Sequence, residues 1–220
     1  MGFKLKNHNI IFIHPPKCGG SSIAEALKKH NYIGSKLNKG AHKSIIGNSK
    51  LNFTSDEYFI TVRNPYSRFY SYYHFCIEWD LKRANGEIKL KSDSKEFHLN
   101  RSKILKEMKF DGFVNLLKDE KLLNKFIIKY KLKHAFKKQV DWYLNQTKKK
   151  VNVFKLEEGT VWKYLRKLGY NVEPIHEKKS TYKTQKGYTD EQAEIVYKYF
   201  KDDFDTLNYN KDDYARATTI

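Results

Sequence analysis

The chain has 220 residues, of which 40% are hydrophobic, and a formal net charge of +18 at pH 7. This length and apolar fraction suit a single domain over residues 1–220 and exclude a disordered chain. Two cysteines exclude a disulfide framework, and the lack of any run of about 18 apolar residues excludes a membrane-spanning helix. The positive charge favours an anionic partner, namely a nucleotide, a nucleic acid, an acidic glycan or a membrane surface, unless lysine is simply frequent in this proteome.

The first residues, Met-Gly-Phe-Lys-Leu-Lys, contain no apolar core of the length found in signal peptides. We therefore expect a soluble protein of the cytoplasm. Oligomeric state is not readable from the sequence.

The first predicted structural unit is a strand, a glycine turn and a helix between residues 9 and 27. Residues 10–13 are apolar and β-branched, which is typical of a buried strand, and two prolines end the run. Gly19 and Gly20 permit a tight turn. Ser21 or Ser22 is predicted to cap the helix. Its inner face carries Ile23, Ala26 and Leu27.

This unit is typical of an anion-binding loop. The first amides of a helix are unpaired and lie at the positive end of its dipole, and Lys17 adds a full charge. The alternative is an ordinary turn that happens to hold a lysine. A Walker loop requires lysine directly after its second glycine, whereas Lys17 precedes both glycines here, so a kinase or ATPase is disfavoured.

A second strand–helix unit follows a polar, glycine-dotted loop at residues 34–50 that contains His42. Residues 58–62 read as a strand, and Arg63, Asn64 and Pro65 follow it, with Asn64 as a good N-cap and Pro65 as a good first helical residue. An aromatic stripe at helical spacing follows, and it predicts a buried helix face. The stripe consists of Tyr66, Phe69, Tyr70, Tyr73 and Ile77.

The later residues predict further helices and one more strand. Residues 80–100 read as a loop with helical fragments, 101–138 as mostly helical with Leu122 and Leu123 on its apolar faces, and 151–156 as a strand. His98 and His134 are interpreted as ordinary surface residues. Helices are predicted from Thr160 to Leu168 and after a capping box at 189–192.

Two motifs in this order resemble the PAPS-dependent sulfotransferases, in which PAPS is 3′-phosphoadenosine 5′-phosphosulfate. Pro-Lys-Cys-Gly-Gly-Ser-Ser at 16–22 resembles their 5′-phosphosulfate loop, in the form found in the branch that sulfates carbohydrates of the heparan and chondroitin type. Arg-Asn-Pro-Tyr-Ser-Arg at 63–68, followed by Ser71, resembles their 3′-phosphate motif. The resemblance implies an α/β fold with a central parallel sheet, P-loop-like in its three layers, and a ligand at the carboxyl ends of the strands.

The resemblance also implies roles for individual residues. Lys17 would stabilise charge on the transferred group, and His42 would take the proton of the acceptor hydroxyl. The 5′-phosphosulfate would be held by Lys17, Cys18, Gly19, Gly20, Ser21 and Ser22. The 3′-phosphate would be held by Arg63 and Ser71, and a later loop with Lys178, Lys179 and Ser180 would close on the nucleotide. No metal is implied.

The predicted reaction moves a sulfuryl group from PAPS to a hydroxyl, which the resemblance implies to be on a glycan, and leaves PAP. A bacterial or viral source would fit, because animal relatives usually carry a Golgi anchor. The alternatives are a basic nucleic-acid-binding protein, a P-loop kinase-like enzyme, and a family member that binds PAPS without turning it over. The nucleic-acid alternative lacks any recognised nucleic-acid motif, so no nucleic-acid partner is expected.

Overall fold

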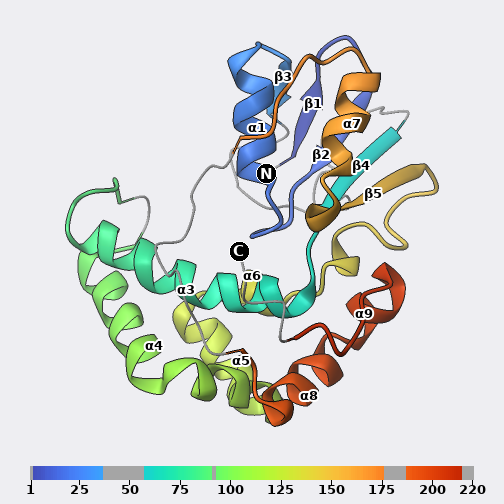
Figure 1. Ribbon diagram of the computed structural model, residues 1–220. Coiled ribbons are helices and arrows are strands. Elements are labelled where there is room, and N and C mark those ends of the chain that lie inside the picture. Colours follow the sequence, from blue (N-terminus) through green and yellow to red (C-terminus); the bar gives the residue numbers. More distant parts are fainter. Residues whose placement is uncertain (1, 37–56, 91–92, 176–186, 215–220) are drawn as a thin grey trace. The chain divides into compact units, whose positions relative to one another are not determined.

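A computed structural model describes residues 2–36, 57–90, 93–175 and 187–214 (Figure 1). The chain divides into two compact units, which are described separately below. The first unit comprises Met1–Asn64 and Lys137–Lys179, and the second comprises Pro65–Phe136 and Ser180–Ile220. The prediction of a single domain over residues 1–220 stays a prediction.

The first unit is built on a mixed five-stranded sheet with the strand order β3-β1-β2-β4-β5. Its strands are β1 (Phe3–Leu5), β2 (Ile10–Ile13), β3 (Ile33–Lys36), β4 (Glu57–Val62) and β5 (Lys150–Lys155). The three central strands β2, β4 and β5 are parallel, with Ile13 opposite Ile60 and Val62 opposite Lys155. The predicted α/β fold with a central parallel sheet is therefore confirmed.

Strands β1 and β3 were not predicted. Strand β1 is antiparallel to both β2 and β3 and contributes the buried side chains of Phe3 and Leu5. It has only three residues, too few for a periodic pattern to stand out. Most of strand β3 was interpreted as the start of a polar loop, because its composition is not typical of a strand. Its pairing with β1 provides the backbone hydrogen-bond partners that make it one.

Helices α1 (Gly20–Lys29) and α7 (Thr160–Lys167) pack against the sheet through one apolar cluster (Figure 1). Phe12 and Phe59, on adjacent strands, stack in this cluster with ring centroids 4.6 Å apart. The predicted inner face of α1 is confirmed, since Ile23 and Leu27 are fully buried. This packing anchors both ends of the loop between β2 and α1.

The described part of the second unit is helical. It contains α3 (Pro65–Ala84), α4 (Lys95–Asn115), η2 (Leu116–Lys118), α5 (Glu120–Tyr130), α6 (Lys133–Phe136), α8 (Asp190–Tyr199) and α9 (Lys201–Leu207). Pro65 is the first residue of α3, as predicted, and the capping box of Thr189 and Gln192 opens α8. The predicted loop over 80–100 is partly wrong, because α3 runs to Ala84 and α4 already begins at Lys95.

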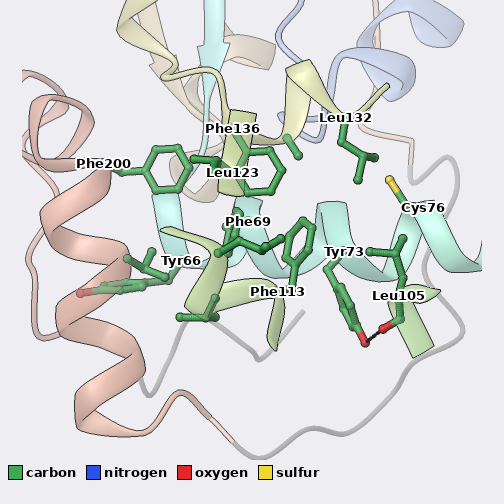
Figure 2. Packing of buried hydrophobic residues seen from close by; sticks show 14 of the residues in the cluster. Tyr66, Phe69, Tyr73, Cys76, Leu105, Phe113, Leu123, Leu132, Phe136 and Phe200 are labelled. Atoms are coloured by element: carbon green, nitrogen blue, oxygen red, sulfur yellow. Dashed lines mark hydrogen bonds between the residues drawn. The ribbon is translucent and has the colours of Figure 1, made fainter. Parts of the chain in front are cut away.

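The core of the second unit is an aromatic cluster around α3 (Figure 2). Phe69 is fully buried and stacks on Phe113 of α4 with ring centroids 4.9 Å apart. The Tyr73 hydroxyl donates a 2.9 Å hydrogen bond to the Leu105 carbonyl, as Figure 2 shows. Four of the five residues of the predicted stripe are buried on α3 and Tyr70 is partly buried, whereas Leu122, predicted on an apolar face, is 51% exposed.

A buried ionic cluster joins α3 to α4 and to the end of α5. Asp80 is fully buried and accepts hydrogen bonds of 2.6 Å from Nε and from Nη2 of Arg101. His98 Nδ1 lies 2.8 Å from Asp80 Oδ1, and Arg101 Nη1 donates to the Tyr130 carbonyl. The interpretation of His98 as a surface residue is therefore wrong. The residues around His98 do not indicate this contact, because Asp80 lies 18 residues earlier in the chain.

We expect Asp80→Ala to lower the free energy of unfolding by about 3–5 kcal/mol, because Arg101 would keep its charge in a buried position without a counterion. Urea denaturation followed by circular dichroism measures this difference. Glu78→Ala on the same helix is the matched control. Glu78 pairs with Lys82 at 2.9 Å in a more exposed position, and its loss should cost less than about 1 kcal/mol. Equal losses for the two variants would contradict the expectation.

Candidate functional site

The loop between β2 and α1 and the first turn of α1 together carry six of the predicted site residues, at positions 17–22. Gly19 is the N-cap of α1 in the left-handed conformation (φ 74°), and its carbonyl accepts hydrogen bonds from the amides of Ser22 and Ile23. The prediction that Ser21 or Ser22 caps the helix is wrong. Because Gly19 turns the chain earlier, both serines lie in the first turn of α1, with their hydroxyls near its N-terminus.

The geometry of this loop suits an anion. The amides of the first turn of α1, which begins at Gly20, lie at the positive end of the helix dipole, and among them the Ser22 amide bonds the Gly19 carbonyl. Lys17 also has a left-handed backbone (φ 67°), a conformation that a non-glycine residue adopts only under local constraint. Lys17, whose side chain carries a full positive charge, therefore lies in the turn itself.

Both glycines of the turn are required by close neighbours. A Cβ atom added to Gly20 would lie 1.9 Å from Cδ2 of His14, and one added to Gly19 would lie 2.4 Å from Cδ1 of Leu156. His14 is nearly buried, and its ring stacks on Phe12 with centroids 5.9 Å apart. The His14 ring therefore has little room to move. A side chain at Gly20 would collide with it, and a side chain at Gly19 would collide with Leu156.

We expect Gly20→Ala to destabilise the protein by about 1–3 kcal/mol, because the new methyl group overlaps the His14 ring. Urea denaturation measures the loss. In the double variant His14→Ala/Gly20→Ala the ring is gone, so the loss should be smaller than the sum of the losses in the two single variants. Additive losses would show that the His14 contact is not the cause.

Strand β4 holds the loop from the adjacent position in the sheet. Thr61 Oγ1 donates a 2.7 Å hydrogen bond to the Cys18 carbonyl. Arg63, directly after the strand, donates from Nη1 to the Lys17 carbonyl at 3.2 Å. The predicted 5′-phosphosulfate loop and the arginine of the predicted 3′-phosphate motif therefore lie side by side in the first unit. The parallel pairing of β2 with β4 brings them together, because the carboxyl ends of parallel strands share one edge.

Two residues outside the predicted site hold these motifs in place. Gln139, which is fully buried, bonds both backbone groups of Arg63 and accepts a hydrogen bond from the Cys18 thiol. Glu157 Oε1 accepts a 2.7 Å hydrogen bond from the Asn64 amide. The resemblance to the sulfotransferases also covered the segment 139–144 and the Leu-Glu pair at 156–157, but it assigned neither Gln139 nor Glu157 this role.

The remaining predicted residues are placed differently. The Cys18 side chain is fully buried and turned toward Gln139, so only its backbone is suited to contact a ligand. Ser71 lies on α3, in the second unit. His42, Lys178, Lys179 and Ser180 lie outside the described residues.

A comparison with protein-family models gives the family of this chain. The model of the Sulfotransferase family matches residues 3–210, which include both strand ends, the glycine turn and Arg63. The chain belongs to the sulfotransferase family. Searches of curated proteins and of solved structures gave no significant match to this sulfotransferase.

The described ranges of this sulfotransferase lack two features. Among those residues, no helix is long and apolar enough to cross a membrane. Within the same ranges, no group of three or more His, Cys, Asp or Glu residues is arranged to hold a metal ion.

Proposed function

We propose that this sulfotransferase moves a sulfuryl group from PAPS to a hydroxyl of a carbohydrate acceptor. The observation that carries the proposal is the contact between Arg63 Nη1 and the Lys17 carbonyl. It joins a loop suited to a 5′-phosphosulfate with an arginine suited to a 3′-phosphate. These are the two groups by which PAPS differs from ordinary adenine nucleotides.

The residues present fit such a donor. The glycine turn lets the loop backbone pass directly against His14 and Leu156, which occupy the space that side chains at Gly20 and Gly19 would need. The first amides of α1 and the hydroxyls of Ser21 and Ser22 are proposed to hold the 5′-phosphosulfate. The guanidinium of Arg63 is proposed to hold the 3′-phosphate through two parallel hydrogen bonds. Roles for Ser71, Lys178, Lys179 and Ser180 are proposed on the resemblance alone.

PAPS supplies an activated sulfuryl group, whose charge is spread over three oxygens. In the proposed step the acceptor oxygen forms a bond to sulfur while the bond from sulfur to the 5′-phosphate oxygen breaks, so that PAP leaves. His42 accepts the proton of the acceptor hydroxyl, for which a neutral imidazole near pH 7 is suited. Lys17 stabilises the charge that develops on the leaving phosphate oxygen.

Calorimetric titration with PAP, with ADP and ATP alongside, tests the proposed donor. We expect PAP to bind in the micromolar range and clearly more tightly than either of the others, because neither has a 3′-phosphate for Arg63. Equal weak binding of all three would indicate a general phosphate-binding loop and contradict the proposal. A steep salt dependence of DNA binding, together with no affinity for PAP, would favour the nucleic-acid alternative instead.

The proposed base is tested by His42→Ala. We expect this variant to lose turnover by about 10²- to 10⁴-fold, the usual contribution of general base catalysis, while its affinity for PAP stays unchanged. Transfer of labelled sulfate from PAPS to a set of acceptor oligosaccharides measures turnover, and calorimetry measures affinity. Full activity of His42→Ala would show that another group takes the proton.

A further inference from the structure

The side chain of Gln139 lies between the two motifs of the proposed donor site. It comes from the segment before η3 (Val140–Trp142), 121 residues after Cys18 and 76 residues after Arg63. It is fully buried. A buried amide must satisfy its polar atoms within the protein, so the groups that it meets are held in place.

The pairing of Gln139 with Arg63 resembles one rung of a β-ladder. Gln139 Oε1 accepts a hydrogen bond from the Arg63 amide at 2.8 Å, and Nε2 donates to the Arg63 carbonyl at 2.8 Å. The ladder between β4 and β5 ends at Val62, one residue earlier. Gln139 thus supplies the partners that Arg63 loses on leaving the sheet, and this fixes the backbone from which its guanidinium projects.

The same oxygen also holds the phosphosulfate loop. Cys18 Sγ lies 3.2 Å from Gln139 Oε1, and the Cys18 carbonyl accepts a hydrogen bond from Thr61. Oε1 therefore bridges the loop after β2 and the residue after β4. A carbonyl oxygen has two lone pairs, so both bonds can form at once.

We propose that Gln139 is a positioning residue, which sets Arg63 and Cys18 at the separation that the donor nucleotide requires. This inference rests on the proposed function, because the ligand whose phosphates it spaces is PAPS. Gln139 does not touch the reacting atoms in this proposal. It acts through the backbone of Arg63 and the thiol of Cys18.

The test compares the affinities for PAP and for 5′-AMP, which differ by the 3′-phosphate. In Gln139→Met, whose side chain has a similar length without the amide, we expect the ratio of the two affinities to fall by about tenfold or more, because a small misplacement of a binding group has large effects. Gln146→Met is the matched control. Gln146 lies in the same segment, bonds the Asp141 carbonyl, and should leave the ratio unchanged.

A double variant separates positioning from general destabilisation. In an Arg63→Ala background the 3′-phosphate has lost the group that Gln139 positions, so adding Gln139→Met should not lower the ratio further. An unchanged ratio in Gln139→Met, or an equal fall with and without Arg63, would overturn the inference. If Gln139→Met does not fold, the test uses the ratio of PAP to 5′-AMP affinity in Gln139→Glu. An ionised glutamate keeps the acceptor for the Arg63 amide and lacks the donor to the Arg63 carbonyl. An unchanged ratio there would also overturn it.

A failure of the proposed function can be distinguished from a failure of the inference about Gln139. If the unmodified protein binds PAP no better than 5′-AMP, the donor assignment fails whatever Gln139 does. The spacing role is then tested on the Cys18 thiol in a Cys76→Ser chain, by its rate of reaction with a thiol reagent. We expect Gln139→Met to raise this rate several-fold, because the buried thiol loses the nearer of its two acceptors, Gln139 Oε1 at 3.2 Å, and keeps the Pro16 carbonyl at 3.6 Å. An unchanged rate would contradict the inference independently of any nucleotide.

Discussion

Lys17→Gly is expected to reduce sulfuryl transfer by about 10²- to 10³-fold, the usual cost of removing one group that stabilises charge in a transition state. The loss should appear in kcat more than in the KM for PAPS, because the charge on the leaving oxygen develops only as the bond to sulfur breaks. Initial rates of PAP formation with acceptor oligosaccharides measure both constants.

Glycine is the informative replacement at this position. Lys17 has a φ of 67°, where a side chain costs roughly 1–2 kcal/mol and glycine costs nothing sterically. This relief offsets the larger entropy that glycine loses on folding, so the free energy of unfolding should stay within about 1 kcal/mol. Inactivity would then be due to the lost ammonium group. Lys163→Ala, an exposed lysine on α7, is the control for charge and should transfer normally.

A wild-type transfer rate in Lys17→Gly would contradict the assignment of Lys17. A fall in the free energy of unfolding of several kcal/mol would instead show that the left-handed turn depends on the lysine side chain. The two outcomes are separated by measuring urea denaturation and kinetics on the same preparation.

Arg63→Ala is expected to weaken PAP binding by about 10- to 100-fold. A hydrogen bond to a charged group contributes about 1.5–3 kcal/mol, and each 1.4 kcal/mol corresponds to about tenfold in affinity. Binding of 5′-AMP should change little, because it lacks the 3′-phosphate. Calorimetry with both nucleotides measures the two affinities.

Arg63→Lys is the matched variant, because it keeps the charge and loses the planar pair of donors. It should recover part of the affinity for PAP but not all of it. An equal loss for PAP and 5′-AMP in Arg63→Ala would contradict a role at the 3′-phosphate. It would instead indicate that the hydrogen bond to the Lys17 carbonyl mainly supports the loop between β2 and α1.

The parts of the fold that were predicted depend on local chemistry. Residues 10–13 and 58–62 form buried strands because each is a short run of β-branched and aromatic side chains. The buried faces of α1 and α3 follow from apolar residues at helical spacing. The capping box at Thr189 and the start of α3 at Pro65 are local for the same reason, since the groups involved lie within four residues of one another.

The predictions that were wrong concern residues whose state depends on packing. The N-cap of α1 is Gly19 and not a serine, and the His14 ring occupies the space where a Cβ of the next residue would lie. His98 is buried because Asp80 is there to pair with it. Asp80 lies 18 residues before His98, outside any short window around it, whereas His14 lies six residues before Gly20 and only the packing shows that the two meet.

The sequence alone was enough to indicate an anion-binding turn after one strand, an arginine after the next, and the sulfotransferase family to which they belong. Both motifs are short stretches whose chemistry is carried by adjacent residues. Only the tertiary structure decided that Arg63 touches the carbonyl of Lys17 and that Gln139 holds Arg63 and Cys18. These contacts arise from the parallel pairing of β2 with β4 and from a chain segment that returns to their ends, which are non-local properties of the fold.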